Sequence, residues 1–158
     1  MLEYVGRAGN EGMPLLRKSV SLLSLWCVCL VFSFAADSTV KLTVFVEGVN
    51  KTGGTIGVYV FRDDKGWPEN KDLACRRVVV SAHPGTVKVE IPDLPPGTYA
   101  VGVGHDSNGN HHIDKNWLGR PTEQWGMSNN PRAYLKTPTF PKAQFTLSQS
   151  AEIHIQLQ

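Results

Sequence analysis

The chain has 158 residues, 41% of them hydrophobic and 19% charged, a size that suits one domain. With 16 basic and 14 acidic side chains, its formal net charge is only +2. A charge this small argues against electrostatic attraction to nucleic acid or to anionic membranes, so we expect neither as a partner.

The N-terminal segment has the pattern of a secretory signal peptide. Arg17 and Lys18 precede an apolar run, residues 19–35, and the small residues Ser33 and Ala35 stand at the −3 and −1 positions of a cleavage site. We expect cleavage after Ala35 and export to the periplasm or the extracellular space, without stable membrane insertion afterwards. The run is also about as long as a short transmembrane span, roughly 17 residues, so an uncleaved anchor is the alternative.

Cleavage at this point divides the chain into a leader and signal peptide, residues 1–35, and a single mature domain, residues 36–158. Three basic and two acidic residues leave with the leader, so the net charge of the mature domain is near +1. Cys27 and Cys29 leave as well, and Cys75 remains alone. The mature domain therefore has no internal disulfide, and its stability must come from its core.

The mature domain is a succession of short segments in which apolar residues alternate with other residues. Residues 40–47 and 56–61 show this pattern on either side of the turn at residues 51–54, which predicts an antiparallel hairpin with one buried face. The same pattern recurs in residues 76–81, 86–91, 99–103, 143–147 and 153–157. No window shows apolar residues at helical spacing. Seven short strands with turns between them predict an all-β sandwich.

One face of the fifth predicted strand is nearly bare. Tyr99, Val101 and Val103 are expected to point into the core. The residues that face the other way are Ala100, Gly102 and Gly104. Glycine inside a strand often marks the close approach of another backbone, which the long segment after this strand would provide. The functional alternative is that the glycines form a flat floor for a ligand.

The long segment, residues 105–142, has no periodicity, and so long a connection is uncommon inside a compact domain. It holds two tryptophans, Trp117 and Trp125, and Tyr134, whereas disordered segments are poor in aromatic residues. We therefore expect an ordered loop that packs on the sandwich. Trp117 and Trp125 are candidate ligand contacts, and the alternative is that they cover one end of the core.

Three stretches, in order, carry a family resemblance: IPDLPPGTYAVGVGHDSNGN, the Ile-Asp pair at 113–114, and LGRPTEQWGMSNN. They resemble the bacterial domain of unknown function family 2141, whose members are small exported proteins. The resemblance covers roughly residues 40–157 and implies the sandwich fold and export, but it names no reaction. The chain departs from the family pattern at His111, where a glycine is expected.

The turn into the fifth strand, residues 94–100, is also similar to the turn of transthyretin-like sandwiches. The expected fold is therefore a seven-stranded antiparallel immunoglobulin/transthyretin-like sandwich with one long ordered loop at about residues 105–142.

The most polar stretch of the chain is HDSNGNHHID, residues 105–114. If Asp106 is counted as position one, Asn108, Asn110, His112 and Asp114 fall at positions three, five, seven and nine. These are the positions that bind calcium in helix–loop–helix sites, where the ion takes oxygen ligands. His111 and Trp117 replace the glycine and the bidentate glutamate of such loops, so Glu123 would have to fold back to supply a carboxylate. The predicted ligands are Asp106, Asn108, Asn110, His112, Asp114 and Glu123. The Kd would be about 10⁻⁴–10⁻³ M.

The alternative is that the Asp and Asn side chains form turns by accepting hydrogen bonds from nearby backbone amides. A transition-metal site at His105, His111 and His112 is disfavoured, because adjacent histidines point to opposite sides of an extended chain. The loop histidines are then ordinary surface residues.

An enzyme is not expected, and no catalytic residue or cofactor other than calcium is predicted. Ser107, Ser128 and His105 are the nearest approach to a nucleophile and base, but no strand–turn–helix nucleophile motif occurs. The transthyretin-like fold includes hydrolases of purine-derived rings that end in Tyr-Arg-Gly-Ser, whereas this chain ends in His154-Ile155-Gln156-Leu157-Gln158.

The preferred interpretation is a non-catalytic binding or envelope module. Its partner would be an unknown ligand or envelope component, with a glycan as one candidate, because loop aromatics can stack on sugars. A hydrolase and a purely structural envelope protein are the alternatives. A ligand that binds the domain saturably would favour the binding module over the structural protein.

Overall fold

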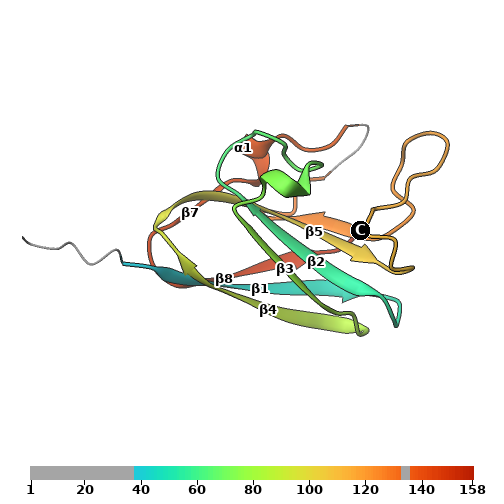
Figure 1. The fold of residues 1–158 in the computed structure, drawn as a ribbon, viewed down its shortest axis with the longest axis horizontal. Coiled ribbons are helices and arrows are strands. Elements are labelled where there is room, and N and C mark those ends of the chain that lie inside the picture. Colours follow the sequence, from blue (N-terminus) through green and yellow to red (C-terminus); the bar gives the residue numbers. More distant parts are fainter. Residues whose placement is uncertain (1–37, 133–135) are drawn as a thin grey trace, which may run out of the picture. The chain divides into compact units, whose positions relative to one another are not determined.

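A computed structural model of the chain describes residues 38–132 and 136–158. Within them, eight strands form two facing sheets, and helix is confined to a single turn of α-helix and a short 3-10 turn (Figure 1). The predicted all-β sandwich is confirmed. The signal peptide and the alternative anchor fall outside these residues. No helix in the part of the chain that the structure describes is long and apolar enough to span a bilayer.

The first sheet, sheet A, has three strands in the order β4 (Gly85–Leu94), β1 (Val40–Val49) and β8 (Ala151–Gln156). The middle strand β1 runs antiparallel to β4 and parallel to β8. The prediction of a wholly antiparallel sandwich is therefore wrong at this one pair. The parallel pair is possible because a long stretch of chain separates β1 from β8.

The second sheet, sheet B, has the order β3 (Arg76–Ser81), β2 (Thr55–Phe61), β5 (Gly97–Asp106) and β6 (Trp125–Met127). All of its pairs are antiparallel, and β7 (Phe145–Leu147) pairs with the first residues of β5. The eighth strand, β6, was not predicted, because three residues around a glycine are too short to show a period of two.

The predicted hairpin between the first two strands is wrong. β1 belongs to sheet A and β2 to sheet B, so the turn at residues 50–54 carries the chain from one sheet to the other. Both strands bury the face that alternation indicated. Alternation shows which face is buried, but it does not distinguish a partner in the same sheet from a partner across the core.

The main core lies between the two sheets and consists mostly of aliphatic side chains. Sheet A contributes Leu42, Val44, Val46, Val87, Val89, Ile91 and Ile155, and sheet B contributes Ile56, Val58, Val60, Tyr99, Val101 and Val103. All of them are at most 4% exposed. The predicted inward face of β5 is confirmed.

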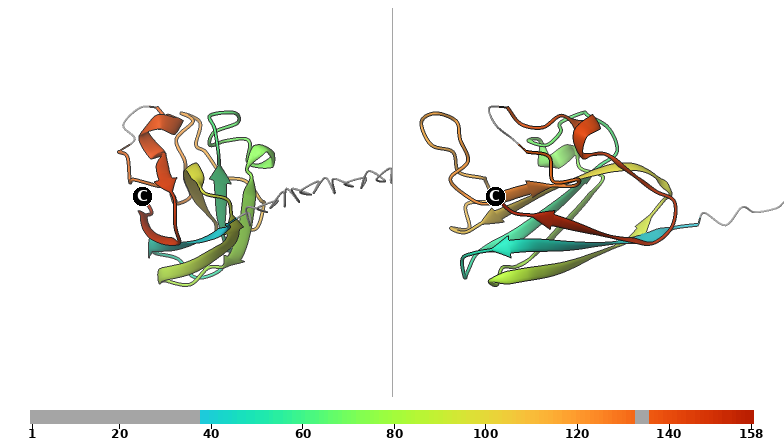
Figure 2. Two further views of the ribbon diagram at one scale, coloured as in Figure 1. Left: turned by 90° about the vertical axis from the view of Figure 1, so that its left-hand side faces the viewer. Right: turned by 180° about the vertical axis from the view of Figure 1, so that it is seen from behind.

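A second, smaller cluster lies on the outer face of sheet B, away from sheet A. It contains Phe61, Ala100, Met127, Phe140 and Ala143. Three connections lie on this side: residues 62–75 with the 3-10 turn η1 (Lys71–Leu73), the loop 107–124, and residues 128–132 and 136–144 with α1 (Phe140–Ala143) (Figures 1 and 2). The outer face is therefore covered by loops instead of a third sheet.

Candidate functional site

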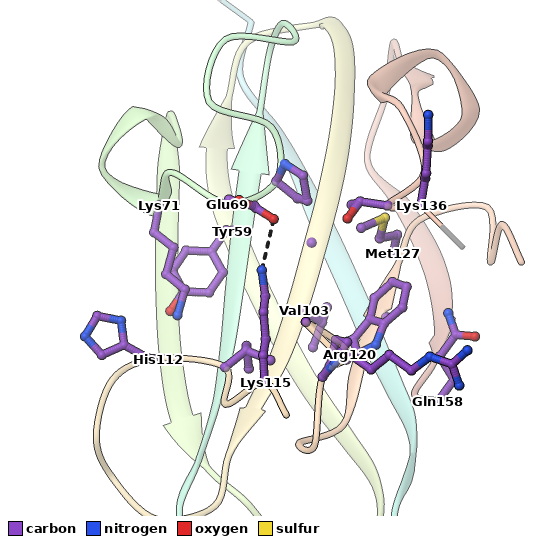
Figure 3. Close-up of a pocket in the computed structure, with 18 of the residues that line it drawn as sticks. Tyr59, Glu69, Lys71, Val103, His112, Lys115, Arg120, Met127, Lys136 and Gln158 are labelled. Atoms are coloured by element: carbon purple, nitrogen blue, oxygen red, sulfur yellow. Dashed lines mark hydrogen bonds and ion pairs between the residues drawn. The ribbon is translucent and has the colours of Figure 1, made fainter. Parts of the chain in front are cut away.

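A pocket of about 850 Å³ lies on the outer face of sheet B, and we call it the outer groove. The sheet register explains why the groove forms. Gly102 in β5 stands directly between Tyr59 in β2 and Met127 in β6. A residue without a side chain between two large ones leaves a trough, whose floor is the backbone of β5 (Figure 3).

The walls of the groove come from segments far apart in the sequence. The β2–β3 connection contributes Pro68, Glu69 and Lys71, and β6 contributes Trp125 and Gly126. The remaining wall residues are His112, Ile113, Lys115, Leu118, Gly119, Arg120 and Pro121 of the long loop, together with Lys136, Thr137 and Gln158. Sequence reasoning had singled out only Trp125 and His112 among these residues.

The glycines on the outer face of β5 have two different roles. At Gly104, a Cβ atom would lie 2.5 Å from Cδ1 of Ile113, so this glycine makes room for the long loop. At Gly102, the nearest atoms to a Cβ would be in Pro68 and Trp67, at 3.8 and 3.9 Å, which is ordinary contact distance. The packing explanation therefore holds closely for Gly104, whereas the space over Gly102, which is also buried, would hold about one methyl group beneath Pro68 and Trp67.

Basic side chains predominate around the groove. Nζ of Lys115 forms an ion pair of 3.1 Å with Oε1 of Glu69, which joins the long loop to the β2–β3 connection (Figure 3). Nζ of Lys71 donates a hydrogen bond of 3.2 Å to the carbonyl of His111 and lies 5.0 Å from the ring centroid of Tyr59. Both contacts hold loops above the sheet.

The polar stretch at residues 105–114 begins where β5 ends, beside the groove. The carboxylate of Asp106 is 7% exposed and accepts three backbone hydrogen bonds, from Gly109 at 2.7 Å, Asn110 at 3.2 Å and His111 at 2.7 Å. Burial alone would raise the pKa of Asp106. The three backbone donors and the nearby His111 outweigh burial, so the pKa of Asp106 lies below its usual value.

The backbone turns at His111, the position where the resemblance led us to expect glycine. His111 has a φ of +66°, in the left-handed region that glycine adopts without steric cost. Nδ1 of its ring lies 3.8 Å from Oδ2 of Asp106. The loop therefore keeps the expected turn, although a residue with a side chain occupies it.

The two asparagines of the stretch both contact Asp114. Nδ2 of Asn108 donates to Oδ2 of Asp114 at 2.8 Å, and Nδ2 of Asn110 donates to Oδ1 at 2.9 Å. Their side-chain oxygens accept from the backbone N–H of Asn110 and His112. These are the turn-forming bonds that the alternative interpretation predicts.

Glu123 folds back onto the stretch. Its Oε1 accepts from the backbone N–H and the hydroxyl of Ser107, both at 2.8 Å, and its Oε2 accepts from the backbone N–H of Asp114 at 3.2 Å. The side chain is 7% exposed and joins both ends of the stretch.

The structure thus gathers five of the six predicted calcium ligands through hydrogen bonds, and the sixth, His112, takes part through its backbone N–H. Among residues 38–132 and 136–158, no three His, Cys, Asp or Glu side chains come together as a metal-binding group. A calcium ion here would therefore need the asparagine oxygens as well.

The side chains considered as nucleophiles and bases have structural partners. Ser128 is 2% exposed, and its hydroxyl donates to the carbonyl of Ala143 at 2.6 Å and accepts from the N–H of Val101 at 2.9 Å. The imidazole of His105, 1% exposed, bonds to the carbonyl of Gly53 at 3.0 Å. These bonds connect β5 to its neighbouring loops.

The three tryptophans among the residues that the structure describes differ in their surroundings. Trp67 packs edge-on against Phe61 and Phe140, at 5.3 and 5.9 Å between ring centroids, and its Nε1 donates to the carbonyl of Pro138. Trp125 is half-buried and lines the outer groove. Trp117 is 90% exposed at the tip of the long loop and does not line the groove.

Most of the groove residues were missed by sequence reasoning, among them Tyr59, Met127, Arg120 and Lys136. The glycine face of β5 was the one available signal, because it indicated where a floor would lie. The walls could not be found in this way, since they depend on strand order and on the course of three loops.

The comparisons with known proteins identify a family. The family described as an uncharacterized protein conserved in bacteria (DUF2141) matches residues 44–156, so the chain belongs to this family. This result confirms the resemblance drawn from the sequence. No curated protein and no solved structure matches the chain.

Proposed function

We propose that this member of the family is an exported, non-catalytic module that binds a small molecule in the outer groove. The observation that carries the proposal is the groove itself, because its volume of about 850 Å³ lies within the range of small-molecule sites, about 300–1,000 Å³. Like such sites, it combines aromatic and apolar walls with a few polar groups. The alternatives are a hydrolase and a structural envelope protein.

The test is a fragment and oligosaccharide screen by nuclear magnetic resonance on residues 36–158. We expect saturable shifts of the backbone amides of Gly102 and Gly126, which line the groove, for at least one compound class. The amides of Lys88 and Glu90, on the exposed edge strand of sheet A, are the internal control. A screen in which no compound moves the groove amides would favour the structural protein.

Export is the second part of the proposal and rests on the signal-peptide pattern of residues 1–35. Expression of the full chain in a bacterial host, followed by mass spectrometry of the secreted or periplasmic protein, should give an N-terminus at Ala36. An intact N-terminus in the membrane fraction would instead identify an anchor.

A calcium ion in the loop 105–124 is a further candidate, favoured by one feature of the geometry. Asn108 and Asn110 both direct their amide groups at Asp114, and rotation of each amide by about 180° would turn its oxygen toward the same point. The rotation would give up two backbone hydrogen bonds, so binding would be weak. Such an ion would tie the loop that forms one wall of the groove.

A further inference from the structure

The charges around the outer groove indicate the class of its ligand. Four basic side chains line the groove: Lys71, Lys115, Arg120 and Lys136. Glu69 is the acidic side chain among the lining residues. Because the net charge of the whole chain is only +2, this excess is local to the groove and is not a property of the whole surface.

Two of the four basic groups have contacts that hold loops in place. Lys115 pairs with Glu69, and Lys71 bonds to a carbonyl and covers the ring of Tyr59. Within the described ranges, 38–132 and 136–158, Arg120 and Lys136 have no acidic partner. They lie on either side of Met127 in the close-up, one on the long loop and one before α1 (Figure 3).

The space between these two cations and the floor is apolar. Tyr59, Met127 and Trp125 stand on the strands beside β5, next to Gly102, which is itself buried beneath Pro68 and Trp67. Met127 is buried, whereas Tyr59 and Trp125 are half-buried, so both aromatic rings have a surface left to contact a ligand. An apolar ligand group would contact these two rings.

We propose that the outer groove binds an anionic amphiphile. Its apolar part contacts Tyr59 and Trp125, and its carboxylate, sulfonate or phosphate group pairs with Arg120 or Lys136, the two lining cations without an acidic partner among the residues that the structure describes. Arginine and lysine both suit such oxyanions, and arginine binds them through two parallel hydrogen bonds. This inference rests on the proposed function, since it names the ligand class of the same groove.

A matched pair of fluorescent probes separates the charge from the apolar body. 8-Anilinonaphthalene-1-sulfonate and N-phenyl-1-naphthylamine share one ring system, and only the first carries an anionic group. We expect the sulfonate to bind at least about tenfold more tightly to residues 36–158, and both probes to shift the amides of Gly102 and Gly126. A tenfold ratio is the size expected for one hydrogen bond to a charged group.

The variant Arg120→Gln/Lys136→Gln tests which cations are responsible. It should remove most of the preference for the sulfonate and leave the affinity for the neutral probe within about twofold. Lys41→Gln/Lys88→Gln is the matched control, because it removes the same charge from exposed side chains of sheet A, and it should preserve the preference. Both pairs of substitutions are at exposed positions, so the fold is retained.

Two results would overturn the proposal of an anionic ligand: equal affinity of the wild type for the two probes, or a preference for the sulfonate that survives Arg120→Gln/Lys136→Gln. The groove would then be one that binds neutral molecules. Binding of the sulfonate without shifts at Gly102 and Gly126 would also overturn the proposal, since the probe would then sit elsewhere. The proposed function itself fails only if neither the probes nor the fragment screen moves the groove amides.

Discussion

The two faces of β5 differ in the size of their side chains and in what covers them. Toward sheet A, the strand presents Tyr99, Val101 and Val103, which are buried in a core of aliphatic side chains. Toward the outside, it presents Ala100, Gly102 and Gly104. Loop residues pack over these three, and Gly102 also lines the outer groove. One strand thus forms a packed wall on one side and lines the proposed binding groove on the other.

The comparison shows how a small sandwich separates stability from function. The inner face buries apolar area against a second sheet, and that burial is the main favourable term in folding. The outer face gains little from β5 itself, and its shape comes from residues on β2, β6 and the loops. Residues of the outer face can therefore change with a smaller loss of stability than residues of the inner face.

The largest effect should come from placing a charge on the inner face. Val101 is 0% exposed, so Val101→Asp buries an unpaired carboxylate, which costs several kcal/mol and should unfold the domain. Gly102→Asp is the matched control, because it places the same charge in the groove among basic side chains. Urea denaturation checks both variants. A folded Val101→Asp beside an unfolded Gly102→Asp would reverse the assignment of the faces.

A methyl group should be tolerated at Gly102, on the outer face of β5, but not at Gly126, where the Cβ would point inward to sheet A. At Gly126, a Cβ would lie 2.7 Å from Cγ2 of Ile155 and 2.9 Å from the carbonyl of Gln156, so Gly126→Ala forces a shift that costs about 1–3 kcal/mol. Gly102→Ala meets nothing closer than 3.8 Å and should cost less than about 1 kcal/mol. Equal losses in chemical denaturation would show that the space over Gly102 does not hold a methyl group.

The third prediction concerns the loop that walls the groove. Asp106→Asn should lower the free energy of unfolding at pH 7 by about 1–2 kcal/mol, because an amide group then faces the N–H of His111. The exposed Asp72→Asn should have little effect.

The sign of the pH dependence of Asp106 follows from its lowered pKa. Its carboxylate stabilises the fold above the unfolded-state pKa of about 3.9, and this contribution is lost as the pH falls through the lower folded-state pKa. The difference between wild type and Asp106→Asn should therefore shrink in acid. A difference that is constant from pH 7 to pH 2 would show that ionisation of Asp106 does not matter.

The smallest effect expected is that of calcium on the same loop. An ion at ten times its Kd that binds only the folded state adds about 1.4 kcal/mol, or several degrees in Tm for a domain of this size. Thermal melts in millimolar calcium and in chelator should differ for wild type and coincide for Asp114→Asn. If the wild-type Tm is the same in calcium and in chelator, there is no calcium site. The Asp and Asn side chains of residues 105–114 then serve only to accept hydrogen bonds from backbone amides.

Much of this domain could be predicted from local patterns. A period of two identified the buried faces of β1, β2, β4 and β5 well enough to define an all-β sandwich, and the row of small residues after Tyr99 indicated an unusual outer surface. The polar spacing from Asp106 to Asp114 indicated a structured loop, and Glu123 does fold back onto it. Each of these features depends on residues close together in the chain or on alternation along one strand.

The tertiary structure decided the rest, because neighbours in a sheet are chosen by contacts between distant segments. It placed β1 and β2 in different sheets, paired β1 with β8 in parallel, and recruited residues 125–127 as a strand. The groove exists only because Tyr59 and Met127 come to flank Gly102, and because Arg120 and Lys136 reach its rim from separate loops. A sequence pattern records which side of a strand is buried, whereas a site made across strands depends on which strands become neighbours.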